Sequence, residues 1–194
     1  MSTKLNVVIA AVAVIALVIG MKLWHHTPQR GTPGGLNVFV ISPPKEIARF
    51  SLLETNGKPF TNSALWANWT FVLFGSATHA TPELTETMNA LNKMTQMIQT
   101  TKQTPVPQIA FISTDLANDS LERIDKFATS FNPNFIGITG DPKQIALLSQ
   151  ELPAKHPTAI LLIDPSGKLA ALFPAPHHPE SMVKDFQIIV QNEG

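Results

Sequence analysis

The chain has 194 residues with 14 basic and 14 acidic side chains, a formal net charge of zero and no cysteine. Balanced charge without a basic run gives no electrostatic footprint for a nucleic acid, so we expect no nucleic-acid partner. The absence of cysteine excludes disulfides, thiolate nucleophiles, cysteine-ligated metal sites and CxxC redox pairs. The sequence has no Ser-His-Asp order, glycine-rich phosphate loop or HExxH motif, and it therefore predicts no enzyme.

The chain begins with an apolar run over residues 5–24, behind a short tail of residues 1–4. At about 1.5 Å per residue, a helix of this length reaches roughly 30 Å, which is enough to cross a bilayer core. The run lacks the polar stripe of a buried amphipathic helix, and it lacks the small-x-small site that a cleaved signal peptide needs. We predict a single transmembrane anchor, with the amino terminus inside and the following domain exported.

A linker and lead-in follow the anchor over residues 25–46. The stretch 27–35 is dense in proline and glycine, which favour neither a helix nor close packing. The apolar stretch 36–41, followed by Pro43 and Pro44, fits either an edge strand or an extended lead-in. Residues 47–194 then have the length of one ordinary domain with a single hydrophobic core.

Strand and helix patterns alternate along this domain. Apolar, β-rich runs predict strands, and apolar residues at helical spacing behind a proline or a capping side chain predict helices. The expected strands span residues 50–53, 69–74, 109–113, 135–139, 159–163 and 168–173. The expected helices run from 82 to a frayed end at 100–102, from about 120 to 130, from 142 to about 152, and from 179 to about 191.

Capping side chains mark several of these boundaries. Thr81 is the expected cap of the helix that begins at residue 82, and either Asp119 or Ser120 caps the next helix. Asn62 or Ser63 is the expected cap of a short helical turn. Three further aspartates at strand or helix ends are explained by capping without catalysis: Asp115, Asp141 and Asp164.

The resulting order is β, α, β, α, β, α, β–β, α. Helices that alternate with buried strands imply a parallel sheet covered on both faces, and the terminal hairpin makes one part antiparallel. The sequence therefore predicts an α/β thioredoxin-like fold, with a βαβ half and a ββα half around a mixed central sheet. The transmembrane helix precedes this domain.

Four segments, taken in chain order, carry a resemblance to a known family: 50–61 together with 69–75, 131–140, 161–169 and 176–180. In these segments the chain resembles the Sco/SenC family, thioredoxin-like copper proteins that help assemble cytochrome c oxidase and are typically anchored at the N-terminus. The resemblance implies a place in the bacterial inner membrane with the domain in the periplasm. It also implies respiratory-complex assembly proteins as partners.

In that family a Cys-x-x-x-Cys motif after the central strand and a distal histidine form the copper site. The positions that match the cysteines are Ala77 and Thr81, in a loop about two residues shorter, and His156 matches the histidine. Neither Ala77 nor Thr81 is a soft copper ligand, so the resemblance implies a degenerate site. We expect a non-catalytic interaction or accessory role in cytochrome c oxidase assembly, with copper implied by the resemblance alone.

A rival interpretation is a metallochaperone that binds copper through a rebuilt histidine site. His79 lies in the same loop, and with His156 and a third ligand such as His177 it would supply imidazole nitrogens. Alternatively, His79 is a surface histidine with no ligand.

Two further patterns have structural interpretations. Three methionines share the helix that begins at residue 82, where thioethers at helical spacing indicate core packing more than Cu(I) binding: Met88, Met94 and Met97. Pro157 precedes a strand at the place of the thioredoxin cis-proline, and its peptide bond could be cis or trans.

Overall fold

The computed structural model describes residues 37–152 and 159–192. The predicted tail and anchor, most of the linker, His156 and Pro157 lie outside these residues. Among the residues that are described, no helix combines the length and the apolar character needed to span a bilayer.

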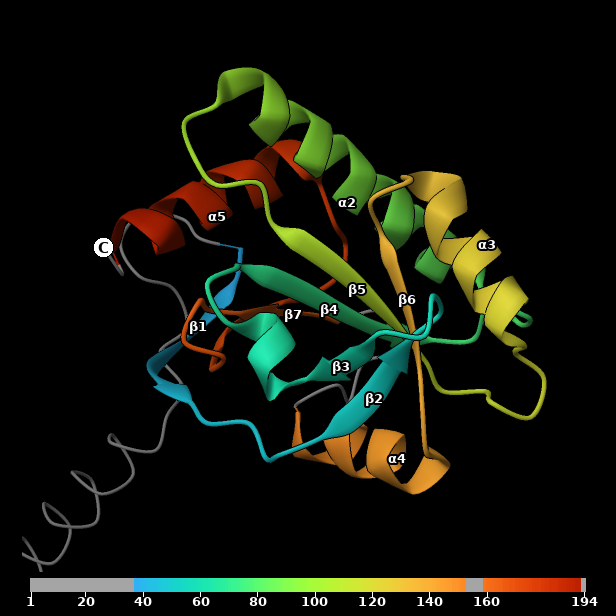
Figure 1. Cartoon of the computed structure of the whole chain (residues 1–194). Coiled ribbons are helices and arrows are strands. Elements are labelled where there is room, and N and C mark those ends of the chain that lie inside the picture. The colour runs from blue at the N-terminus through green and yellow to red at the C-terminus, as the bar shows by residue number, and fades with distance from the viewer. Residues whose placement is uncertain (1–36, 153–158, 193–194) are drawn as a thin grey trace, which may run out of the picture. The chain divides into compact units, whose positions relative to one another are not determined.

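An eight-stranded mixed sheet forms the centre of the domain (Figure 1). Its strands are β1 (Phe39–Lys45), β2 (Ser51–Glu54), β3 (Pro59–Thr61), β4 (Thr70–Gly75), β5 (Gln108–Ser113), β6 (Ile136–Thr139), β7 (Ile160–Ile163) and β8 (Leu169–Phe173). They lie in the order β1-β8-β7-β4-β5-β6-β2-β3. The neighbours β4, β5 and β6 are parallel, and the remaining pairs are antiparallel. The predicted mixed sheet is confirmed, and β1 is the edge strand that the lead-in pattern allowed.

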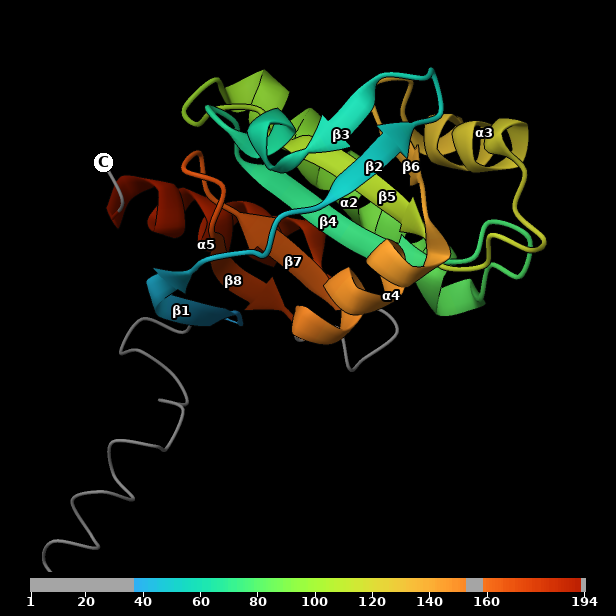
Figure 2. The ribbon, with the colours of Figure 1, turned by 60° about the horizontal axis from the view of Figure 1, so that its bottom comes forward.

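Helices cover both faces of this sheet. Helices α2 (Pro82–Thr101), α3 (Leu121–Phe131) and α5 (Pro179–Asn192) pack on one face, and α4 (Pro142–Glu151) packs on the other (Figures 1 and 2). The central strand β4 is buried on both sides because successive side chains of a strand point to opposite faces. Phe71 and Leu73 join the core under α2 and α5, whereas Val72 and Phe74 join the core beside α4.

The helix starts follow the predicted capping chemistry. The Thr81 hydroxyl accepts from the Leu84 amide at 3.2 Å, and Asp141 likewise caps α4. Of the two candidates before α3, Ser120 is the cap, since its hydroxyl accepts from the Arg123 amide at 3.2 Å. Asp119 is therefore available for another role.

The short 3-10 turn η1 (Asn62–Leu65) departs from the prediction. It begins after Thr61 and has no side-chain cap, so the expectation that Asn62 or Ser63 caps it is wrong. The Asn62 carboxamide instead binds the segment between β1 and β2: its oxygen accepts from the Phe50 amide at 3.0 Å, and its nitrogen donates to the Ala48 carbonyl at 3.1 Å. These bonds satisfy backbone groups that no strand partners, which a local sequence pattern does not reveal.

The methionines of α2 are core residues, as expected. Met88 and Met94 are fully buried, and Met97 packs against the same cluster. Met88 and Met94 are therefore enclosed in the core, whereas Met97 is only partly buried.

Candidate functional site

The loops that follow β4 and β5 lie side by side at one edge of the sheet. The two strands are parallel neighbours, and their last residues, Gly75 and Ser113, pair directly. The loop 76–81 then leads into α2, and residues 114–120 lead into α3. A Cβ on Gly75 would lie 2.7 Å from the Leu84 side chain, so glycine allows α2 to pack closely against the end of β4. The expected position of loop 76–81 at the carboxyl end of the central strand is confirmed.

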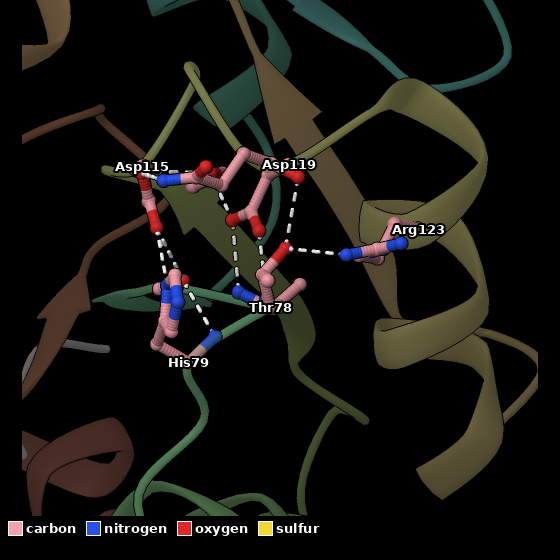
Figure 3. Close-up of polar contacts among 9 residues, drawn as sticks. Thr78, His79, Asp115, Asp119 and Arg123 are labelled. Carbon is pink, nitrogen blue, oxygen red and sulfur yellow. Dashed lines mark hydrogen bonds and ion pairs between the residues drawn. The ribbon is translucent and has the colours of Figure 1, made fainter.

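Asp119 fixes the backbone of this loop (Figure 3). Its carboxylate accepts from the amides of Ala77 at 2.8 Å and Thr78 at 2.7 Å, and from the Ser113 hydroxyl at 2.6 Å. The side chain is only 6% exposed. Burial by itself raises the pKa of this carboxyl, but the hydrogen bonds from Ser113, Thr78 and Ala77 outweigh it and hold the pKa below its usual value.

Asp115 orients the imidazole of His79. The Nδ1 atom of His79 lies 2.8 Å from Oδ2 of Asp115, which also accepts from the Ser76 hydroxyl at 3.0 Å. The other carboxylate oxygen accepts from the Asn118 amide group at 2.8 Å. The bonds from His79 and Asn118 lower the pKa of the Asp115 carboxyl. Asp115 caps no helix, so the capping explanation offered for it is wrong.

Thr78 links the two loops to α3. Its hydroxyl donates to the Asn118 carbonyl at 2.9 Å and accepts from Nη1 of Arg123 at 3.0 Å (Figure 3). Since Arg123 lies in the first turn of α3, the loop, the β5–α3 connection and α3 form one hydrogen-bonded unit.

Ala77 and Thr81, the two positions that the resemblance matches to the family cysteines, have structural roles. The Ala77 side chain packs against the core under α2, and its amide is bound by Asp119. The Thr81 hydroxyl caps α2. A copper site with two soft ligands therefore does not fit these residues, because one side chain has no donor atom and the other is a hard oxygen engaged in a cap.

The histidines of the predicted site are only partly described. His79 lies in the loop, with 67% of its side chain exposed. His156 lies outside the described residues, so the expected convergence of His79 and His156 stays a prediction. His177 is half-buried and lies in the connection from β8 to α5. Within residues 37–152 and 159–192, no three His, Asp or Glu side chains are placed to hold a metal ion together.

The sequence analysis missed the roles of Asp115 and Asp119 in the site, although their positions in the sequence indicate where they lie. Asp115 and Asp119 follow β5 by two and six residues, and loop 76–81 follows β4. Polar residues at the carboxyl ends of neighbouring parallel strands meet at the same edge of a sheet. That rule would have placed both aspartates beside loop 76–81, although it would not have distinguished their partners.

The fold and this edge together define a thioredoxin-like protein without thiols. A family model described as SCO1/SenC matches residues 41–191, which is most of the chain, and the chain belongs to this family.

The relatives and solved structures agree with that assignment. The SCO2-like protein RC0895 of Rickettsia conorii is 25% identical over 199 residues, covering 91% of this chain and 95% of that protein. The mitochondrial SCO2 homolog of Mus musculus is 23% identical over 153 residues, covering 71% of this chain and 60% of that protein. The crystal structure of yeast Sco1 with copper bound matches with a TM-score of 0.70 and 19% identity, over 77% of this chain and 95% of that one. At this identity the structural match shows the fold alone.

Proposed function

We propose that this chain is a membrane-anchored accessory protein of respiratory-complex assembly, which acts through contacts made by its thiol-free edge. The observation that carries the proposal is the hydrogen-bonded scaffold in the loop where the resemblance places the family's thiols. Asp119 fixes the backbone of loop 76–81, and Asp115 fixes the imidazole of His79 in that loop. The edge thus keeps a defined shape without a residue that could take part in thiol–disulfide exchange.

Membership of the SCO1/SenC family and the resemblance to assembly proteins of cytochrome c oxidase support the proposed context. The apolar run over residues 5–24 supports attachment to the bacterial inner membrane, with the domain in the periplasm. A preformed surface favours a contact role, because ordering a loop upon binding costs free energy that a preordered loop does not lose.

The test is genetic complementation with loop variants. Cells that lack this chain should lose cytochrome c oxidase activity in their membranes, and the full-length wild type should restore it. Asp119→Ala, which frees two loop amides, should restore much less activity at equal protein level. Asp125→Ala serves as the matched control, since Asp125 is an exposed carboxylate that accepts from the Thr55 hydroxyl. Normal oxidase activity in cells lacking the chain would contradict the proposal.

The second candidate function is copper binding through His79 with His156. The observation that favours it is the contact between His79 and Asp115, because histidines that bind metals commonly donate their other nitrogen to a carboxylate. In addition, β7 runs antiparallel to β4, so the chain enters β7 at the edge where loop 76–81 lies. Cu(II) titration of the full-length protein, with His156→Ala and His79→Gln, tests it. The same His79→Gln variant separates the two functions in complementation, since the glutamine amide can still donate to Asp115 but is a poor copper ligand.

A further inference from the structure

Strand β1 presents two adjacent bulky hydrophobic side chains to solvent at one margin of the sheet (Figure 2). Phe39 and Val40 are each 48% exposed. Successive side chains of a strand point to opposite faces, so these two flank the free edge of β1 on both sides. The other exposed large hydrophobic side chains of the described residues are isolated along the chain: Leu53, Trp66, Val106, Leu121 and Leu147. Single exposed hydrophobics are ordinary, whereas an adjacent pair at an edge indicates a contact surface.

Phe39 continues an apolar layer of the sheet outward to this edge. It lies directly opposite Leu172 of β8, and both Leu172 and Ile41 are partly buried against the core on the α4 side. Residues 37–44 include no charged side chain. This margin of the sheet is therefore apolar and uncharged, and its transfer out of water is favourable.

The position of this edge in the chain indicates what it contacts. The described domain begins at Asn37, and the apolar run that is predicted to cross the membrane ends at residue 24. As a coil, the intervening residues 25–36 would span roughly 20 Å. Because β1 is the first strand after them, its edge is held within reach of the bilayer surface, which raises the effective concentration of lipid there.

A second polypeptide strand is a poorer occupant of the same edge. Pro43 and Pro44 have no N–H to donate, and the pairing of β1 with β8 is irregular between Val40 and Lys45. Proline and irregular pairing at an edge disfavour the addition of another strand. Contact with lipid headgroups needs no ladder of hydrogen bonds, because water in that hydrated region satisfies the free backbone groups.

We propose that Phe39 and Val40 insert into the interfacial region of the bilayer and hold this margin of the domain against the membrane. Apolar side chains such as Phe commonly enter the boundary between headgroups and acyl chains. The inference rests on the membrane anchor of the proposed function and adds a second point of contact. Two contacts restrict the rotation of the domain about its linker, so loop 76–81 meets a membrane-bound partner in a limited set of orientations.

The test uses the full-length chain in lipid nanodiscs of phosphatidylethanolamine and phosphatidylglycerol, with one chain in each disc. Because the chain has no cysteine, Val40→Cys provides a unique thiol for a nitroxide label. Leu147→Cys is the matched control, because Leu147 is an aliphatic residue of α4 that is 66% exposed. EPR spectroscopy measures how often each label collides with oxygen, which concentrates in lipid, and with a water-soluble nickel chelate.

We expect the ratio of oxygen to nickel collisions to be about threefold or more higher at position 40 than at position 147, since oxygen partitions into apolar surroundings and the chelate does not. Phe39→Ser should lower the ratio at position 40 toward the control. Equal ratios at the two positions in chains that float with the discs would overturn this inference and leave the anchor standing. Chains that do not associate with the discs would overturn both. A high ratio that appears only in discs with two chains would assign the edge to a second copy and overturn the lipid contact.

Discussion

Asp115 and Asp119 are four residues apart after β5, yet their surroundings give them different roles. Asp119 is buried and binds two backbone amides of loop 76–81, whereas Asp115 is partly exposed and binds side chains. A carboxylate is well suited to the buried position because its two oxygens accept several hydrogen bonds at once. At the scale of single residues, these two side chains give the thiol-free edge its shape.

Removing the charge of Asp119 should therefore loosen the loop. Asp119→Asn keeps the size of the side chain but leaves one oxygen to serve the amides of Ala77 and Thr78 and the hydroxyl of Ser113. We expect a loss of about 2 kcal/mol in the free energy of unfolding, the usual cost of leaving buried donors without an acceptor. Urea denaturation measures this loss, and amide hydrogen exchange at residues 77 and 78 should become faster.

The loss of stability caused by Asp119→Asn should depend on pH in a defined direction. Because the pKa of Asp119 is lowered in the folded protein, its contribution to stability is present above the unfolded value of about 4 and is lost as the pH falls through the folded value. The difference between wild type and Asp119→Asn should shrink in acid. A stability difference between the two proteins that stays constant from pH 7 down to pH 2 would show that the charge of Asp119 does not cause it.

Restoring the family's two thiols tests the correspondence of positions. Ala77→Cys combined with Thr81→Cys should raise Cu(I) affinity by several orders of magnitude, since thiolates are soft ligands. The matched control is Ala77→Ser with Thr81→Ser, which keeps an oxygen cap on α2 and adds no thiol. Competition with a chromophoric Cu(I) chelator measures the affinity. Equal copper affinity of the cysteine and serine pairs would show that the shortened loop does not bring the two side chains together.

At the scale of elements, sequence patterns were most informative where local chemistry decides the structure. The helix from Pro82 was predictable because Thr81 caps it and its buried face repeats every three to four residues. The cap of turn η1 was not predictable, because Asn62 binds the segment between β1 and β2, and the partner of a carboxamide is a tertiary feature. For the same reason the sequence located loop 76–81 but not the contacts of Asp115 and Asp119, which depend on which strands are neighbours.

Helix α5 carries a buried carboxylate that links it to the lead-in. Asp185 is 3% exposed, and one of its oxygens accepts from the Asn37 amide at 3.1 Å. Burial raises the pKa of this carboxyl despite the bond from Asn37 and the neighbouring charge of Lys184. With a raised pKa in the folded protein, the contribution of Asp185 to stability is complete below the unfolded value of about 4, and it is lost as the pH rises through the folded value.

Asp185→Asn should for this reason stabilise the domain at neutral pH. The amide keeps an oxygen for the Asn37 amide and removes a buried charge, so we expect the free energy of unfolding to rise by on the order of 1 kcal/mol at pH 7. At pH 3, where the wild-type carboxyl is protonated, the two proteins should be equally stable. Chemical denaturation at both pH values measures this, and a variant that is less stable at pH 7 would contradict the argument.

At the scale of the whole molecule, the sequence predicts a membrane anchor ahead of the thioredoxin-like domain. The apolar run over residues 5–24 predicts that the full-length protein stays in the membrane fraction after an alkaline carbonate wash. A reporter fused to the C-terminus should be active in the periplasm. Replacing Val14 and Leu17, near the middle of the run, by arginine should release the protein, since charges in a bilayer core cost several kcal/mol. A shortened soluble form of the wild type would instead indicate a cleaved signal peptide.

The position of β1 has a mechanical consequence. It is an edge strand, hydrogen-bonded to β8 alone, and it is the first strand after the linker (Figure 2). Any tension that reaches the domain through its N-terminus is therefore borne first by the bond from Asn37 to Asp185 and by the β1–β8 ladder. Two further strands, β8 and β7, lie between β1 and β4. Pulling would separate β1 from β8 before it strained the pairing of β4 with β5. Loop 76–81, at the carboxyl end of β4, therefore keeps its conformation under load.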